Sequence, residues 1–271
     1  GQAQWIDRPA IQQVVDLQGD ERVKVENAAG RAMIAARMNP NIEPFSDPAV
    51  RKALNHAIDR EELMASVLRG TGDLGDSIVP PIVDGYDPSF FEYAYDPEKA
   101  KAMLAEAGHG DGLEVELLYS DLWWWLEPLA IQLADQLSDV GVTVQPTRIT
   151  GSDMRSRGAP GVSDMPFFVF EDGPIVLDPV YTLYLLAHSE GVSNRMGYSN
   201  PDLDALIDEA RQTLDRDRRI ELMTEAQKIW MDDAPWMVVA YPRVFEAMAP
   251  GISGWVPHPD DHERWSDLRM E

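Results

Sequence analysis

Ser46–Gly70, SDPAVRKALNHAIDREELMASVLRG, is the stretch that decides the fold, because it predicts two consecutive helices. Ser46 is of a residue type that caps helix N-termini. Pro48 falls in the first turn, where its missing N–H leaves no hydrogen bond unmade. Apolar residues then recur at the i, i+3, i+4, i+7 and i+8 spacing of one buried helix face: Val50, Ala53, Leu54, Ala57 and Ile58. We therefore expect the first helix to pack on a core.

The second half of this stretch predicts a helix with its own start and stop. Asp59 and Glu62 have the spacing of a capping box, and Gly70 stands where a helix end favours a positive φ. The apolar side of this helix is made of Leu63, Met64, Val67 and Leu68. Taken alone, the pattern predicts a packed helix pair and no activity.

Helices and strands alternate along the rest of the chain, which predicts an α/β fold. The alternating segments 113–119 and 142–149 flank a helical pattern at 126–140, so we expect a parallel βαβ unit. Further strands are predicted at 31–38, 166–170, 234–241 and 244–248. Further helices are predicted at 96–108, 178–187, from 200 to 214, and 217–231. We expect weakly patterned chain at 1–30, a loop at 71–95 and a short irregular segment at 151–162.

Composition excludes several classes of partner. The 271 residues are 44% apolar, which is enough for a core, yet no apolar run approaches the ~20 residues of a membrane span. The net charge of −24 disfavours nucleic acid, because such a surface repels phosphate. The chain has no cysteine, so it forms no disulfide or thiolate metal site. No signal peptide is visible, and the start GQAQW, without Met, predicts a processed or cut end.

Catalytic and metal-binding patterns are weak. His258 and His262 flank Pro-Asp-Asp, but Pro259 disfavours a helical metal site, and a solvated loop is the favoured interpretation. His56 lies inside the helix pair and is interpreted as structural. The chain has no G-x-S-x-G elbow, phosphate-binding loop or G-x-G-x-x-G motif. We therefore predict no enzyme, no cofactor and no metal, with an α/β hydrolase as a weaker alternative.

Trp123, Trp124 and Trp125 are the first candidate binding residues. They fall between a predicted strand end and a helix start, where open α/β sheets place ligands. Three adjacent indoles cannot all face one core, so we expect at least one to be exposed or to line a cleft. Packing inside the protein is the alternative interpretation. As a platform they suit sugar rings, aromatic side chains or extended peptides.

Four ordered blocks resemble the signatures of the family 5 extracellular solute-binding proteins of bacterial ABC importers. They are FSDPAVRKALNHAIDREEL at 45–63, DPEKAKAMLAEAG at 96–108, YSNPDLDALIDEA at 198–210 and EAQKIWMDDAPW at 225–236. The family includes oligopeptide, dipeptide and nickel receptors. The resemblance implies a periplasmic-binding-protein-like fold of type II, in which two lobes close on a ligand.

Family members are roughly twice as long, and this chain resembles their C-terminal half. The resemblance implies that residues 1–32 are a remnant of lobe I with the crossover. Residues 33–243 would form lobe II, with a mixed sheet flanked by helices, and residues 244–271 would return to lobe I. The N-terminal lobe of the same protein would then be missing. Either the chain is a fragment, or its gene encodes a half-receptor that acts as an interaction module.

The function implied by the resemblance is that of a substrate-binding component of an ABC importer. Such a protein captures a peptide or similar small polar solute outside the cytoplasmic membrane and delivers it to the transmembrane subunits of the permease. We expect a periplasmic protein, or an extracellular lipoprotein. Oligosaccharides or opine-like metabolites are the alternative ligands.

Phe170, Glu171 and Asp172 complete the candidate ligand-binding residues. In peptide-binding members an Asp after a strand holds the α-ammonium of the ligand, and Asp172 best matches that position, with Glu171 as the neighbouring alternative. The Trp of the family motif is replaced by Val169 or Phe170, and the spacing to the next Asp-Pro is longer.

Overall fold

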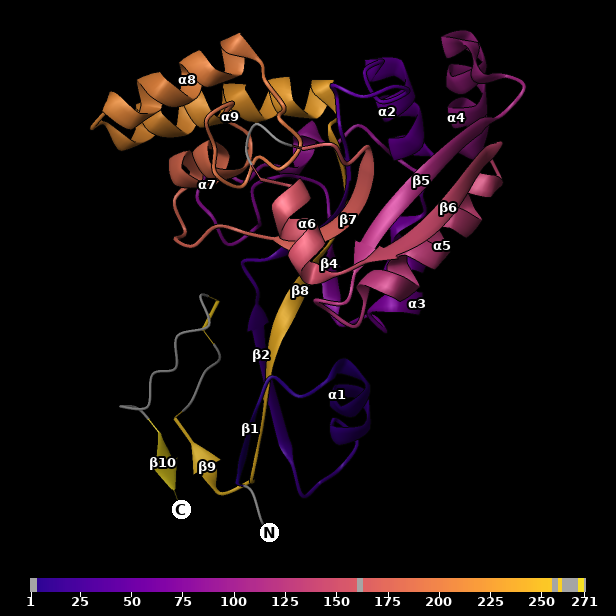
Figure 1. The fold of residues 1–271 in the computed structure, drawn as a ribbon. Coiled ribbons are helices and arrows are strands. Elements are labelled where there is room, and N and C mark those ends of the chain that lie inside the picture. The colour runs from indigo at the N-terminus through magenta and orange to yellow at the C-terminus, as the bar shows by residue number, and fades with distance from the viewer. Residues whose placement is uncertain (1–3, 160–162, 255–257, 260–267, 271) are drawn as a thin grey trace.

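A computed structural model describes residues 4–159, 163–254, 258–259 and 268–270 of the chain (Figure 1). The α-helices are α1 (Ile11–Leu17), α2 (Pro48–His56), α3 (Arg60–Val67), α4 (Pro97–Leu104), α5 (Leu126–Ser138), α6 (Gly151–Arg157), α7 (Pro179–Leu186), α8 (Pro201–Gln212) and α9 (Arg216–Asp233). The strands are β1 (Trp5–Asp7), β2 (Lys24–Ala29), β3 (Met33–Met38), β4 (Gly72–Leu74), β5 (Leu113–Ser120), β6 (Val142–Ile149), β7 (Phe167–Asp172), β8 (Trp236–Met248), β9 (Ile252–Ser253) and β10 (Arg269–Met270). Short turns η1 (Pro88–Phe90) and η2 (Ala105–His109) complete the elements.

A mixed sheet forms the centre of the fold, as predicted. Its order is β1-β8-β3-β7-β5-β6, with β2 and β4 also paired to β8. Strand β5 runs parallel to β6 and to β7, which confirms the βαβ unit predicted around α5. Strand β3 is antiparallel to both of its neighbours, β7 and β8. The fold class is therefore α/β with a mixed sheet flanked by helices.

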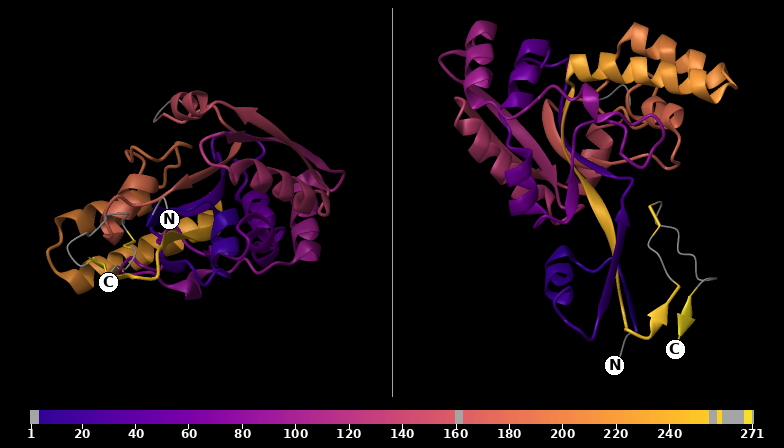
Figure 2. Two further views of the ribbon diagram at one scale, coloured as in Figure 1. Left: turned by 90° about the horizontal axis from the view of Figure 1, so that it is seen from below. Right: turned by 180° about the vertical axis from the view of Figure 1, so that it is seen from behind.

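Strand β8 joins two parts of the molecule. Its first half pairs with β3, and its second half pairs with β1 and β2, beside helix α1. Figures 1 and 2 show β8 running from the helix-covered body into this smaller part. The prediction of two separate strands, at 234–241 and 244–248, is wrong, because β8 is one continuous strand. Within it, Pro242 stands between Ala240, which pairs with β3, and Arg243, which pairs with β2. The missing N–H of Pro242 therefore falls where the strand changes partners.

Two hydrophobic clusters cover opposite faces of the central strands. Successive apolar residues of β3 and β7, and of β8 as far as Val239, alternate between them, because side chains in a strand point to opposite faces. One cluster packs under α7, α8 and α9, and the other under α2, α3 and α5. Every residue of β3 is buried, as expected for a strand covered on both faces.

The helix pair at 46–70 forms as predicted, with two corrections to its caps. All five predicted core positions are buried, although Ala57 and Ile58 follow the end of α2 at His56. Its cap is Asp47, whose carboxylate accepts from the backbone N–H of Ala49 (2.7 Å), and not Ser46. Asp59 caps α3 by accepting from the N–H of Glu62 (3.0 Å). The return bond of a capping box is absent, because the N–H of Asp59 donates to Gln136 of α5 instead.

Two segments predicted as irregular or weakly patterned are ordered. Residues 151–157 form α6, capped by Thr150, whose hydroxyl accepts from the N–H of Asp153 (3.0 Å). Residues 11–17 form α1, in which Val14 is buried, and residues 24–29 form β2. Both helices are seven residues long, so their apolar periodicity is too short to read from sequence.

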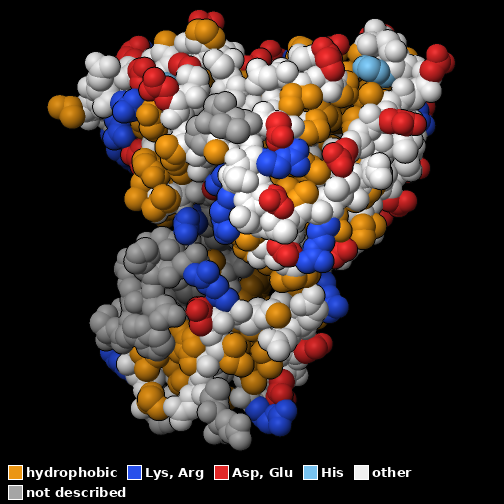
Figure 3. All heavy atoms as spheres, viewed as in Figure 1, with side chains coloured by type: hydrophobic (Ala, Val, Ile, Leu, Met, Phe, Trp, Pro, Cys, Tyr) orange, Lys and Arg blue, Asp and Glu red, His pale blue; other side chains and the backbone are white. Residues whose placement is uncertain are grey.

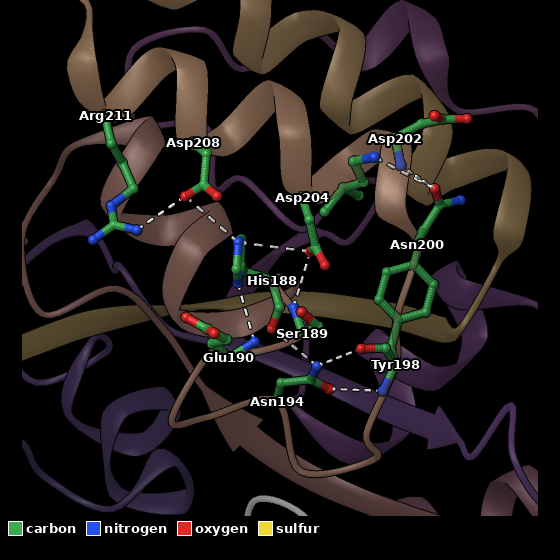
Figure 4. A network of polar contacts seen from close by, with 11 residues as sticks. His188, Ser189, Glu190, Asn194, Tyr198, Asn200, Asp202, Asp204, Asp208 and Arg211 are labelled. Carbon is green, nitrogen blue, oxygen red and sulfur yellow. Dashed lines mark hydrogen bonds and ion pairs between the residues drawn. The ribbon is translucent and has the colours of Figure 1, made fainter.

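The connection between α7 and α8 is held by a polar network (Figure 4). The amide of buried Asn194 donates to the carbonyls of His188 (3.0 Å) and Tyr198 (2.7 Å), and its oxygen accepts from the Tyr198 N–H (3.0 Å). Nδ1 of His188 accepts from the N–H of Glu190, and Asp204 of α8 accepts from the N–H of Ser189. These bonds fix the backbone on both sides of Arg195.

Candidate functional site

A cleft of about 740 Å³ lies where the body of the fold meets the part built on β1 and β2. All six ligand-binding residues predicted from the sequence line it: Trp123, Trp124, Trp125, Phe170, Glu171 and Asp172. They meet because β5 and β7 are parallel, so the carboxyl ends of both strands lie at one edge of the sheet. The cleft is also lined by residues from 8–11, 30–32 and 242–245, which were not predicted as site residues.

The aromatic side of the cleft is a continuous series of ring contacts. Phe170 meets Trp123 edge to face with centroids 5.4 Å apart, and Trp123 stacks on Trp125 at 6.3 Å. Trp124 stands edge to face against Trp125 at 5.3 Å and is 39% exposed. The expectation that at least one indole is exposed or lines a cleft is thereby confirmed. Such a wall binds flat or apolar groups by stacking.

Asp172, at the end of β7, lies between two arginines. Its Oδ2 is 3.4 Å from a guanidinium nitrogen of Arg37 and 3.9 Å from Nε of Arg195. The Asp172 side chain is 15% exposed, whereas that of Arg37 is fully buried. This carboxylate therefore already has two cationic neighbours within the chain, which is an unexpected setting for a residue matched to an ammonium anchor.

Arg37 is buried among aromatic rings on the face of β3 that carries α7 to α9. Its guanidinium lies 3.8 Å from the ring centroid of Trp236 and 5.3 Å from that of Phe170. Burial lowers the pKa of Arg37 to about 10, Asp172 opposes that shift, and Arg195 adds to it. None of its three guanidinium nitrogens makes a hydrogen bond within the described residues. Asp172 is the carboxylate that offsets this buried charge.

Arginines outnumber carboxylates in the cleft, although the chain as a whole has 47 Asp and Glu against 23 Lys and Arg. The lining includes five arginines, Arg8, Arg31, Arg155, Arg195 and Arg243, against the carboxylates of Glu171 and Asp172. Figure 3 shows Lys and Arg side chains gathered at the waist of the molecule, while acidic side chains are spread over the upper surface. Among the described residues, the cleft lining thus has the opposite charge balance to the chain as a whole.

Besides Arg195, two of these arginines lie within 4.0 Å of a carboxylate. Arg243 pairs with Asp73 at 2.8 Å, and Arg8 lies 3.8 Å from Asp7. Arg155, on α6, is exposed and makes no hydrogen bond or ion pair within the described part of the chain. Arg37, Arg155 and Arg195 were not predicted from the sequence. A charged residue inside the apolar strand pattern at 31–38 was the available signal for Arg37.

The other candidates from the sequence add no second site. His56 is buried, and its Nδ1 lies 2.9 Å from the carbonyl oxygen of Ala94, which agrees with a structural role. His262 lies outside the described residues. Among the residues that the structure does describe, no group of three or more His, Asp or Glu side chains is arranged to hold a metal. Nor is any described helix long and apolar enough to cross a membrane.

The cleft with its aromatic and cationic lining lies in a mixed α/β sheet. The chain belongs to the bacterial extracellular solute-binding proteins of family 5, whose middle-region model matches residues 1–194. This confirms the resemblance seen in the four sequence blocks. Proteins of this family are solute-binding proteins and not enzymes, and they are periplasmic or extracellular.

Individual relatives bind different solutes. The chain is 28% identical to heme-binding protein A of Haemophilus influenzae, over 97% of this chain and 49% of that protein. It is 27% identical to the dipeptide-binding protein of Escherichia coli K12, over 100% of this chain and 51% of that protein. The structure of HbpA2 from Haemophilus parasuis superposes with a TM-score of 0.90 at 23% identity, covering 100% of this chain and 54% of that one. The chain thus spans about half the length of the curated relatives it matches.

Proposed function

We propose that this chain is part of the substrate-binding component of an ABC importer, which captures a peptide or similar small polar solute and delivers it to the permease. The observation that carries the proposal is the cleft of about 740 Å³, with an aromatic wall and oriented polar groups, in a family 5 chain. A volume of this size matches small-molecule sites, which are typically ~300–1,000 Å³. The role is capture and release of an unchanged solute, not catalysis.

We also propose that the cleft is one half of a larger site. Residues 33–243 form lobe II, and residues 1–32 and 244–271 belong to lobe I, whose N-terminal bulk lies elsewhere in the same protein. The matched relatives are about twice as long, and β8 runs directly from one part of this chain into the other. Ile175 and Val176, just after β7, are exposed apolar residues suited to a closing lobe.

The proposed location is the periplasm, or the outer face of the membrane through a lipid anchor. The proposed protein partner is the pair of transmembrane subunits of the permease, which would recognise the closed form. Family membership supports both statements, because solute-binding proteins of this family work outside the cytoplasmic membrane.

Ligand-dependent thermal shift of the complete protein, as its gene encodes it, tests the proposal. Panels of peptides, oligosaccharides and opine-type conjugates are screened, and mass spectrometry identifies each bound compound after release. We expect at least one class to raise Tm and to be recovered unchanged. Recovery of a converted product would contradict the binding role and favour the hydrolase alternative.

A further inference from the structure

Among the described residues, two guanidinium groups lie within 4.0 Å of the Asp172 carboxylate, and Glu171 is the other carboxylate of the cleft lining. Asp172 contributes one carboxylate, while Arg37 at 3.4 Å and Arg195 at 3.9 Å contribute two guanidinium groups. An ammonium group placed there would be a third cation around one carboxylate. A carboxylate placed there would leave two charges of each sign. Because like charges at such distances repel and opposite charges attract, the local balance favours an anion.

Arg195 is the cation of this cluster that a solute can reach. Its side chain is 19% exposed and lines the cleft, whereas Arg37 is fully buried behind Phe170. The guanidinium of Arg195 lies 5.0 Å from the ring centroid of Phe170, at the start of the aromatic wall. Its buried Nε makes no hydrogen bond within the described residues. A guanidinium has only donors, so its natural partner is an oxyanion.

The backbone around Arg195 is held by hydrogen bonds within the chain. The residues on either side of it are fixed by Asn194, which bonds to the backbone of His188 and Tyr198 (Figure 4). A cation on a fixed loop loses little freedom on binding, which favours tight contact with a charged group.

Other groups along the cleft are donors as well. Trp125 lines the cleft, and its Nε1–H is buried without an acceptor among the described residues. An indole N–H can only donate. Arg155 adds an exposed cation from α6 that has no ion pair within the described ranges. These groups call for acceptor oxygens on the ligand.

We propose that the solute presents a carboxylate to Arg195, beside the Asp172–Arg37 pair, and that Asp172 does not anchor a ligand ammonium. The inference rests on the proposed function as a solute receptor and narrows its ligand class to organic anions. Peptides with a blocked or acylated amino end and carboxyalkyl amino acids belong to this class. Asp172 acts as the counter-ion of a buried arginine.

Matched probes on the complete protein test this charge preference. One dipeptide, alanyl-phenylalanine, is compared with a free amino end, an N-acetyl group and an N-succinyl group, which adds a carboxylate. A wider panel pairs other carboxylates with their amides. We expect the N-succinyl form to bind more tightly than the free form, and carboxylates to bind more tightly than their amides. Tighter binding of the free ammonium form, or equal binding of carboxylates and amides, would overturn the inference.

Variants identify the responsible cation. Arg195→Gln should weaken carboxylate binding about 10- to 100-fold, because it removes charge-assisted hydrogen bonds. Arg155→Gln, on a separate element, should weaken it less. Arg157→Gln is the matched control, since this α6 residue pairs with Asp164 (2.7 Å) and does not line the cleft. A folded Arg195→Gln protein with unchanged affinity would refute the assignment.

Folding is checked by circular dichroism, and the comparison of probes on the unaltered protein stands even if a variant misfolds. If no compound of any charge binds the complete protein, the receptor function itself is wrong, and the inference is overturned with it. If only amines or neutral compounds bind, the receptor function holds and the charge preference alone is wrong.

Discussion

Asp172→Asn should destabilise the protein by about 3 kcal/mol, because it leaves the guanidinium of Arg37 buried without its carboxylate. At 3.4 Å and an effective dielectric constant of about 20, the attraction between the two charges is about 5 kcal/mol. The net loss is smaller, since Asp172 is 15% exposed and its own burial cost disappears with its charge. Breaking buried ion pairs by removing one partner costs about 3–5 kcal/mol in general.

Urea unfolding measures this loss. A denaturant dependence of about 3 kcal/mol per molar converts it into a fall of about 1 M in the unfolding midpoint. The double variant Arg37→Met with Asp172→Asn should regain part of the stability, because no buried charge then lacks a partner. A double-mutant cycle separates the interaction energy between Arg37 and Asp172 from the effects of the two single substitutions on stability.

An exposed ion pair provides the control for this cycle. Arg157→Gln should change the free energy of unfolding by less than about 0.5 kcal/mol, since Arg157 and Asp164 are 33% and 66% exposed. If Asp172→Asn matches this small effect and the cycle shows no coupling, Asp172 is not the counter-ion of Arg37. The structural reason for excluding it as an ammonium anchor would then be lost.

Further substitutions test three features of the fold. Asp47→Ala should cost about 1 kcal/mol in thermal or urea unfolding and Ser46→Ala much less, because the cap of α2 is the Asp47 carboxylate; the reverse order would restore Ser46 as the cap. Gly70→Ala should cost about 1 kcal/mol, because φ is +72° while no atom lies near the added methyl group. Gly110→Ala, at φ −63°, is the control and should be neutral or stabilising. Equal losses of stability in the Gly70 and Gly110 variants would exclude backbone strain at Gly70 as the cause. Asn194→Ala should speed amide hydrogen exchange between residues 188 and 198, because it removes three hydrogen bonds to the loop backbone; unchanged exchange would mean that Arg195 is positioned by other contacts.

Local patterns predicted most elements because the interactions that form them lie within a few residues. The Asp-Pro and Asn-Pro starts of α4, α7 and α8 all form, and their capping side chains accept from backbone N–H groups in the first turn. Gly70 ends its helix region with a positive φ, as the sequence predicts. The short helices α1 and α6 escaped prediction because seven residues hold too few periodic positions.

Part of the candidate site was predicted from the sequence, because its residues follow predicted strands. Trp123 and Asp172 follow predicted strands, and the parallel arrangement of those strands places both at one edge of the sheet. The lining from residues 8–11 and 242–245 was not predicted, because the strand at 244–248 was expected to be separate and its pairing with β2 depends on residues more than 200 positions away.

The sequence alone determined the α/β class, most of the helices, the family and six residues of the cleft. Only the tertiary structure decided the electrostatic role of Asp172. Its partners Arg37 and Arg195 lie 135 residues before it and 23 residues after it, and no local spacing relates the three positions. The charge at the end of the cleft is a sum over groups from different elements, so it exists only once β3, β7 and the connection between α7 and α8 have come together.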